Sequence, residues 1–121
     1  MKRILIAEQN RNYASALQAM LSGAGYEADV VYDGWLAYNR LTEKEYDLLL
    51  MEMDCPRLSA ADLLTKIHAQ AKVVPTVGLT DKHPFFRTDE ESFTAVLGKP
   101  VRAEQLLSTI ESILNKGEKN D

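Results

Sequence analysis

Apolar residues along the chain fall into short runs, separated by stretches in which they recur at helical spacing. The runs predict five strands, at residues 3–7, 26–32, 46–53, 72–80 and 95–100. The third run is apolar almost throughout, which is typical of a central strand covered on both faces. The second alternates between apolar and polar residues, which indicates a half-exposed strand at the edge of a sheet.

Between the runs, apolar residues three and four positions apart predict amphipathic helices. Their buried faces are expected to comprise Tyr13, Leu17, Met20, Leu21 and Ala24, then Ala60, Leu63, Leu64, Ile67 and Ala71, and, in a last helix from about 102 to 116, Leu106, Leu107, Ile110, Ile113 and Leu114. Gly23 and Gly25 are expected to end the first helix, and Asp33 and Ser59 to cap the second and third.

Strands that alternate with helices predict parallel pairing, right-handed crossovers and helices on both faces of an open sheet. The interval 81–94 departs from this pattern. It contains Pro84 and the adjacent Phe85 and Phe86, and it has no sustained apolar stripe. We therefore expect a short, distorted or mobile helix between the fourth and fifth strands.

The composition predicts one globular domain, residues 1–116, followed by a polar tail at 117–121. No apolar run approaches the length of a bilayer span, which argues against a membrane protein. The net charge of −4, without clustered Lys and Arg, argues against nucleic-acid binding. The single cysteine, Cys55, cannot form an internal disulfide, and we expect a cytoplasmic protein.

Polar residues follow four of the predicted strands, and in open parallel sheets functional sites form beyond the carboxyl ends of strands. The residues are Glu8 and Gln9 after the first strand, Glu52 at the end of the third, Thr80 at the end of the fourth, and Lys99 followed by Pro100 at the end of the fifth. We expect these side chains to lie close together and to form the site.

This arrangement resembles the receiver domain of two-component response regulators, and the resemblance runs over essentially the whole chain. It implies an α/β, flavodoxin-like (βα)5 fold, a doubly wound parallel five-stranded sheet with strand order 2-1-3-4-5. In that family two acids after the first strand and an aspartate after the third hold Mg²⁺, and this aspartate accepts a phosphoryl group from a histidine kinase. By resemblance Glu8 and Gln9 stand for the acidic pair, Glu52 for the phosphoacceptor, Thr80 for the switch hydroxyl, and Lys99, joined to Pro100 by a cis peptide, for the family's lysine.

The sequence departs from the family at the residues that carry its chemistry. Gln9 replaces an anionic ligand by a neutral amide, which should weaken Mg²⁺ binding markedly. Glu52 is one methylene longer than aspartate, which displaces its carboxylate from in-line attack geometry. Val96 stands where the family usually has an aromatic, and the interval from Thr80 to Lys99 is short, so the output surface should differ.

Two interpretations of Glu52 stay open. Its carboxylate could imitate a phosphorylated aspartate by pairing with Lys99 and meeting Thr80, or it could form a plain structural pair with Lys99. Asp54 stands where the family supplies a backbone carbonyl to the metal, and it is either a solvated loop acid or an added ligand. In the second case Glu8, Gln9, Glu52 and Asp54 would form a weak site that tolerates Ca²⁺ or Mn²⁺ better than Mg²⁺.

The remaining reactive side chains have no arrangement that indicates catalysis. Cys55 is expected to be a small, partly buried residue, and His68 and His83 are isolated from other ligands. Trp35 is expected to pack in the core. Phe85 and Phe86 suit either the core or an interface.

The sequence therefore predicts a non-enzymatic signalling module that binds a protein partner, a histidine kinase or a downstream effector, without depending on phosphorylation. A homodimer is compatible with this prediction. The alternative is a working receiver, phosphorylated at Glu52 in the acidic pocket with a divalent metal. A nucleotide-binding flavodoxin-like domain is disfavoured, because residues 7–12 lack the glycines needed for close approach of a phosphate.

Overall fold

A computed structural model describes residues 1–82 and 93–115, and it contains one parallel sheet with strand order β2-β1-β3-β4-β5. The strands are β1 (Arg3–Ala7), β2 (Glu27–Val31), β3 (Leu48–Glu52), β4 (Thr76–Thr80) and β5 (Ala95–Gly98). All four pairings between neighbours are parallel. The predicted strand order and the predicted edge position of the second strand are both confirmed.

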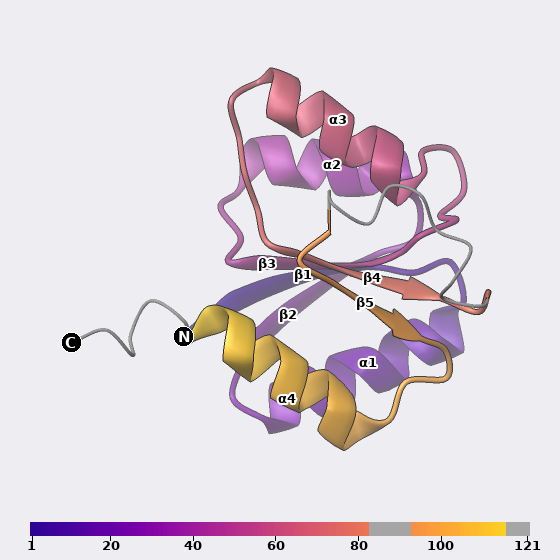
Figure 1. Ribbon diagram of the computed structural model, residues 1–121, viewed down its shortest axis with the longest axis vertical. Helices are drawn as coiled ribbons and strands as arrows, with labels where there is room; N and C mark the ends of the chain where they lie inside the picture. Colours follow the sequence, from indigo (N-terminus) through magenta and orange to yellow (C-terminus); the bar gives the residue numbers. More distant parts are fainter. Residues whose placement is uncertain (83–92, 116–121) are drawn as a thin grey trace.

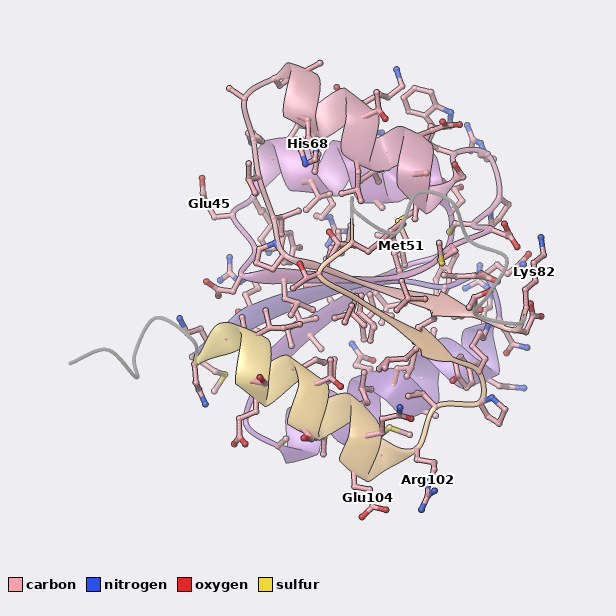
Figure 2. All side chains as sticks on the ribbon, viewed as in Figure 1. Glu45, Met51, His68, Lys82, Arg102 and Glu104 are labelled. Atoms are coloured by element: carbon pink, nitrogen blue, oxygen red, sulfur yellow. The ribbon has the colours of Figure 1, made fainter. Side chains whose placement is uncertain are left out.

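Helices cover both faces of the sheet, as Figure 1 shows. On one face lie α1 (Arg11–Gly23) and α4 (Ala103–Leu114), and on the other lie α2 (Gly34–Glu43) and α3 (Ala60–Ala69). Each face has its own apolar core. Because successive strand residues point to opposite faces, Leu50 joins the core under α1 and α4, whereas Met51 lies between the sheet and α2 and α3 (Figure 2).

The helix ends follow local sequence signals. The Asp33 carboxylate accepts a hydrogen bond from the Leu36 N–H at 2.8 Å, and the Ser59 hydroxyl accepts one from the Asp62 N–H at 3.2 Å. Both predicted caps are therefore confirmed. Gly25, just beyond the end of α1, has φ +95, a left-handed conformation that glycine adopts without strain.

Two residues predicted to be buried are exposed, because the helices stop before reaching them. α1 ends at Gly23 and α3 at Ala69. Ala24 and Ala71 were expected to be buried because the apolar spacing was extended to them, but they lie after the helix ends and are exposed. Ala71 has φ 61, which turns the chain out of the helix. Those two predictions were wrong.

The fourth strand is shorter than the apolar run that predicted it. It begins at Thr76, directly after Pro75, because proline has no N–H to contribute to the strand pairing. The predicted irregular helix at 81–94, with His83, Phe85 and Phe86, falls mostly outside the described residues, as does the tail at 117–121. No helix in the described part of the chain is long and apolar enough to cross a bilayer.

Candidate functional site

The predicted site residues converge at one edge of the sheet. Because the strands are parallel, the ends of β1, β3, β4 and β5 meet there, with Ala7 opposite Met51, Glu52 opposite Leu79 and Thr80 opposite Gly98. A hollow of about 130 Å³ opens at this edge and is lined by Gln9, Glu52, Asp54, Thr80, Asp81 and Lys99. The Lys99–Pro100 peptide bond is cis, as the resemblance implies.

Glu8, which precedes Gln9 just after the end of β1, is fully buried. One carboxylate oxygen accepts a hydrogen bond from Lys99 Nζ at 2.9 Å, and the other accepts one from the Asn10 backbone N–H at 3.0 Å. A buried carboxylate is costly unless it is paired and hydrogen-bonded. Both oxygens of Glu8 are therefore satisfied by donors of the fold itself.

Glu52 is held mainly by Gln9. The Gln9 backbone N–H reaches Oε1 at 3.3 Å, and the Gln9 side-chain Nε2 reaches Oε2 at 3.2 Å. Lys99 Nζ lies 3.6 Å from Oε2, which is further than its distance to Glu8. Gln9 thus presents its amide nitrogen to the pocket as a donor to Glu52.

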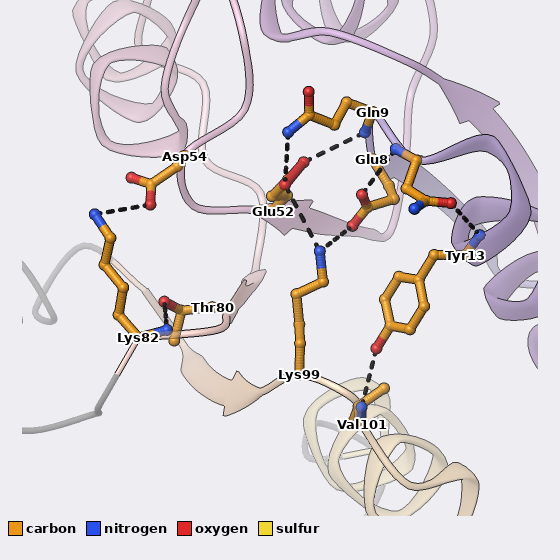
Figure 3. Close-up of polar contacts among 10 residues, drawn as sticks. Glu8, Gln9, Tyr13, Glu52, Asp54, Thr80, Lys82, Lys99 and Val101 are labelled. Carbon is orange, nitrogen blue, oxygen red and sulfur yellow. Dashed lines mark hydrogen bonds and ion pairs between the residues drawn. The ribbon is translucent and has the colours of Figure 1, made fainter.

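Lys99 provides the positive charge of the pocket, and Figure 3 shows its ammonium between the two carboxylates. Burial acts to lower the pKa of Lys99. The hydrogen bond and charge of Glu8, together with the charge of Glu52, outweigh this effect and raise the pKa above its ordinary value. Lys99 is therefore a cation at neutral pH.

Thr80 and Asp54 make their contacts elsewhere, with Lys82. The Thr80 hydroxyl accepts a hydrogen bond from the Lys82 backbone N–H at 3.0 Å, and Lys82 Nζ lies 3.1 Å from the Asp54 carboxylate. Both charged side chains are more than half exposed, so this pair contributes little stability. Among the residues described, no hydrogen bond joins Thr80 to Glu52.

Among the residues described, this arrangement leaves few oxygens free to face a divalent cation, which needs several. The oxygens of Glu8 and Glu52 accept hydrogen bonds, Gln9 presents nitrogen, and Asp54 pairs with Lys82. Within residues 1–82 and 93–115, no three His, Cys, Asp or Glu side chains form a group that could hold a metal ion. That the predicted metal site is weak or lost stays a prediction.

Cys55, in the loop after Glu52, is buried and unsuited to nucleophilic chemistry. Burial first, and then the negative charges of Glu52 and Glu8, raise the pKa of its thiol to about 12. Trp35 packs on the core beside Tyr38, with ring centroids 5.7 Å apart, as its core assignment predicts. His68 is exposed on α3.

A larger hollow, of about 220 Å³, opens at the opposite end of β3 and β4. Its two lysines are already engaged by the fold. Lys72 Nζ donates to the Leu41 carbonyl near the end of α2 at 3.2 Å, and Lys44 pairs with Asp29 at 3.4 Å. Both lysines that the structure describes in the lining of this hollow are therefore already paired.

The sequence did not single out Tyr13 and Asn10 as site residues. Asn10 contributes a backbone N–H to Glu8, and Tyr13 contacts both Lys99 and the backbone after it. Tyr13 was expected only as part of an apolar helix face. The signal that could have found both is their place directly after the acidic position, in the loop and first turn at the carboxyl edge of the sheet.

Comparison with known proteins gives a consistent family assignment. Residues 4–111 match the profile described as the response regulator receiver domain. The chain is 26% identical over 116 residues to the regulatory protein VanRB of Enterococcus faecalis, covering 94% of this chain and 53% of that protein. It is 29% identical over 114 residues to the transcriptional regulatory protein DltR of Streptococcus agalactiae, covering 89% and 50%. The chain thus spans about half the length of these relatives.

Solved structures agree with the fold. The signal receiver domain of a putative Luxo repressor protein from Vibrio parahaemolyticus superposes with a TM-score of 0.88 at 18% identity, covering 99% of this chain and 95% of that one. A response regulator receiver domain protein from Clostridium thermocellum gives a TM-score of 0.87 at 21% identity, covering 98% of both chains.

Proposed function

Since this chain belongs to the response regulator receiver domain family of two-component signalling, we propose that it signals through protein–protein contacts without being phosphorylated. Under this proposal the domain is not an enzyme and works in the cytoplasm. It contacts a histidine kinase or a downstream effector, or a second copy of itself.

The observation that carries the proposal is the hydrogen bonding of Glu52. Both of its oxygens accept from Gln9, and Lys99 is shared with the fully buried Glu8. Phosphoryl transfer depends on positioning and on neutralising charge at the transferred group. In this pocket the donors and the cation already serve the protein's own carboxylates.

Imitation of a phosphorylated aspartate by Glu52 has weaker support than a structural pair. Lys99 lies 2.9 Å from Glu8 and 3.6 Å from Glu52, so its closer partner is Glu8. The Thr80 hydroxyl accepts from the backbone of Lys82. A phosphoryl group would also bring about −1.5 to −2 charges and three acceptor oxygens, against one charge and two oxygens for glutamate. We therefore favour a pocket fixed in one state.

The first prediction concerns phosphorylation itself. Incubation of the protein with acetyl phosphate and Mg²⁺ should give no mass increase, measured by intact-protein mass spectrometry. Glu52→Gln is the matched control, since it keeps the side-chain length and removes the acceptor. A stoichiometric, base-labile mass gain in the wild type that is absent from Glu52→Gln would establish the alternative, a working receiver phosphorylated in its acidic pocket with a divalent metal.

A further inference from the structure

Tyr13 connects the pocket to the chain that follows Lys99. It lies in the first turn of α1, where its backbone N–H donates to the side chain of Asn10 at 2.9 Å. Its ring centroid lies 4.8 Å from Lys99 Nζ, and its hydroxyl accepts a hydrogen bond from the Val101 backbone N–H at 2.9 Å (Figure 3). One side chain therefore contacts the pocket's cation and the backbone two residues beyond it.

We propose that Tyr13 is a positioning residue that holds the Lys99 ammonium between Glu8 and Glu52. A lysine side chain has many rotamers. The two carboxylates contact the Lys99 ammonium at 2.9 and 3.6 Å, and the side of the ammonium that faces neither of them needs another contact to hold it in place. The ring of Tyr13 provides an electron-rich face within the distance at which a cation is attracted to an aromatic ring.

The hydroxyl of Tyr13 also helps to position Lys99, through the backbone at Val101. Val101 is only 6% exposed, so its backbone N–H needs a partner within the protein. It lies just before Arg102, the N-cap of α4, whose side chain makes no capping hydrogen bond. The Tyr13 hydroxyl satisfies the Val101 N–H and so fixes the backbone from which the Lys99 side chain extends.

The inference rests on the proposed function only in treating Lys99 as the pocket's internal cation. Its test is made on metal-free, unmodified protein and reports the position of Lys99 and the protection of the Val101 N–H. A mass gain with a phosphodonor would overturn the proposed function and leave this test unaffected. If Lys99 does not lie against the Tyr13 ring in the wild type, this inference fails, and the proposed function is left unaffected.

Two variants separate the two contacts. Tyr13→Phe keeps the ring and removes the hydroxyl, whereas Tyr13→Leu removes both. In NMR spectra of the wild type and of Tyr13→Phe, the ring should shift the ε-methylene protons of Lys99 upfield, and NOE cross-peaks should join them to the γ-methylene protons of Glu8. In Tyr13→Leu these cross-peaks should weaken, because Lys99 is no longer held beside Glu8. Amide exchange at Val101 should become about tenfold faster in both variants, as expected for the loss of one hydrogen bond.

A matched control is Tyr38→Phe, which removes a tyrosine hydroxyl on α2, across the sheet from Tyr13, and should change neither signal. Lys99–Glu8 cross-peaks that stay undiminished in Tyr13→Leu, or unchanged Val101 exchange in Tyr13→Phe, would overturn the proposal. If Tyr13→Leu does not fold, Tyr13→Met gives the same comparison, because methionine also lacks a ring and adapts to irregular spaces.

Discussion

Gln9 determines the electrostatics of the pocket through its two donors to Glu52. An aspartate at this position would turn oxygens towards Glu52 and place a third carboxylate beside Glu8 and Glu52, which already share Lys99. Like charges at such distances repel strongly in a partly buried site. A bound cation would then be the natural way to relieve the repulsion.

The second prediction follows from this contrast. The double change Gln9→Asp with Glu52→Asp should create measurable Mg²⁺ binding in isothermal titration calorimetry, whereas the wild type should give no binding heat. Gln9→Asn with Glu52→Asp is the control, since it shortens both side chains and leaves residue 9 neutral. If the Gln9→Asp and Glu52→Asp variant also gives no heat, the loss of the metal site has a cause beyond these two side chains.

The sequence predicts which residues come together at the site, but it does not predict which of their atoms are in contact. Glu8, Glu52 and Lys99 were expected together because parallel strands end at the same edge. Whether Gln9 turns oxygen or nitrogen towards the pocket depends on the side chain opposite it, Glu52, which is 43 residues away in the chain. The role of Tyr13 depends in the same way on the backbone at Val101.

At the scale of elements, Gly34 fixes how α2 meets the loop after β3. A Cβ on Gly34 would lie 1.8 Å from the Leu58 carbonyl oxygen, and the Gly34 N–H donates to the Pro56 carbonyl at 3.0 Å. Only glycine permits so close an approach of two backbones. The loop from β3 to α3, which begins directly after Glu52, is therefore packed directly on the start of α2.

The third prediction tests this contact. Gly34→Ala should lower the free energy of unfolding by about 1–3 kcal/mol, the range for overpacking a tight site. Gly23→Ala, at the end of α1, is the control, since its Cβ would meet nothing within 4 Å. It should be neutral or stabilising by up to about 1 kcal/mol. Urea denaturation measures both, and equal stabilities would rule out a tight contact at Gly34.

The fourth prediction concerns Asp29 on β2. The hydrogen bond from Tyr46 is the main cause that lowers the pKa of Asp29, with Lys44 and Arg40 adding to it against the effect of burial. A lowered pKa in the folded state means that Asp29 contributes stability above its ordinary value of 3.8, and that this contribution is lost as the pH falls through the folded value.

The change Asp29→Asn should therefore destabilise the protein near neutral pH by about 1 kcal/mol, a modest figure because the side chain is partly exposed. The difference from the wild type should shrink in urea denaturation series as the pH falls below 3.8. Lys44→Gln is a useful comparison, since it removes a weaker partner. If the difference in stability between Asp29→Asn and the wild type does not change with pH, the charge of Asp29 is not the source of the stabilisation.

The ends of elements were harder to predict than their existence. Asp33 and Ser59 were correctly identified as caps because a side-chain oxygen before an apolar helix face satisfies the free N–H groups there. The end of α3 has no glycine or proline to mark it, so apolar spacing extended the helix to Ala71. The interval 81–94 was set apart by its lack of apolar spacing, and the short, distorted or mobile helix expected there stays a prediction, because most of the interval lies outside the described residues.

For the whole molecule, the strand order allows residues far apart in the chain to form one pocket. Glu8 and Lys99 are 91 residues apart in the chain. They meet because β1, β3, β4 and β5 lie side by side in that order in the sheet and run parallel, so that their carboxyl ends share one edge. The fold of a receiver is therefore retained. We infer that the donors and the cation of the pocket it creates are taken up by the protein's own carboxylates.

The fifth and most direct test is an NMR titration of the protein with Mg²⁺ and beryllofluoride, a stable imitation of a transferred phosphoryl group. If the pocket is closed to a phosphoryl group, the backbone signals of Gln9, Glu52, Thr80 and Lys99 should show no saturable change. Saturable shifts at these residues that require both Mg²⁺ and beryllofluoride, and that disappear in Glu52→Gln, would show a competent pocket and contradict the account.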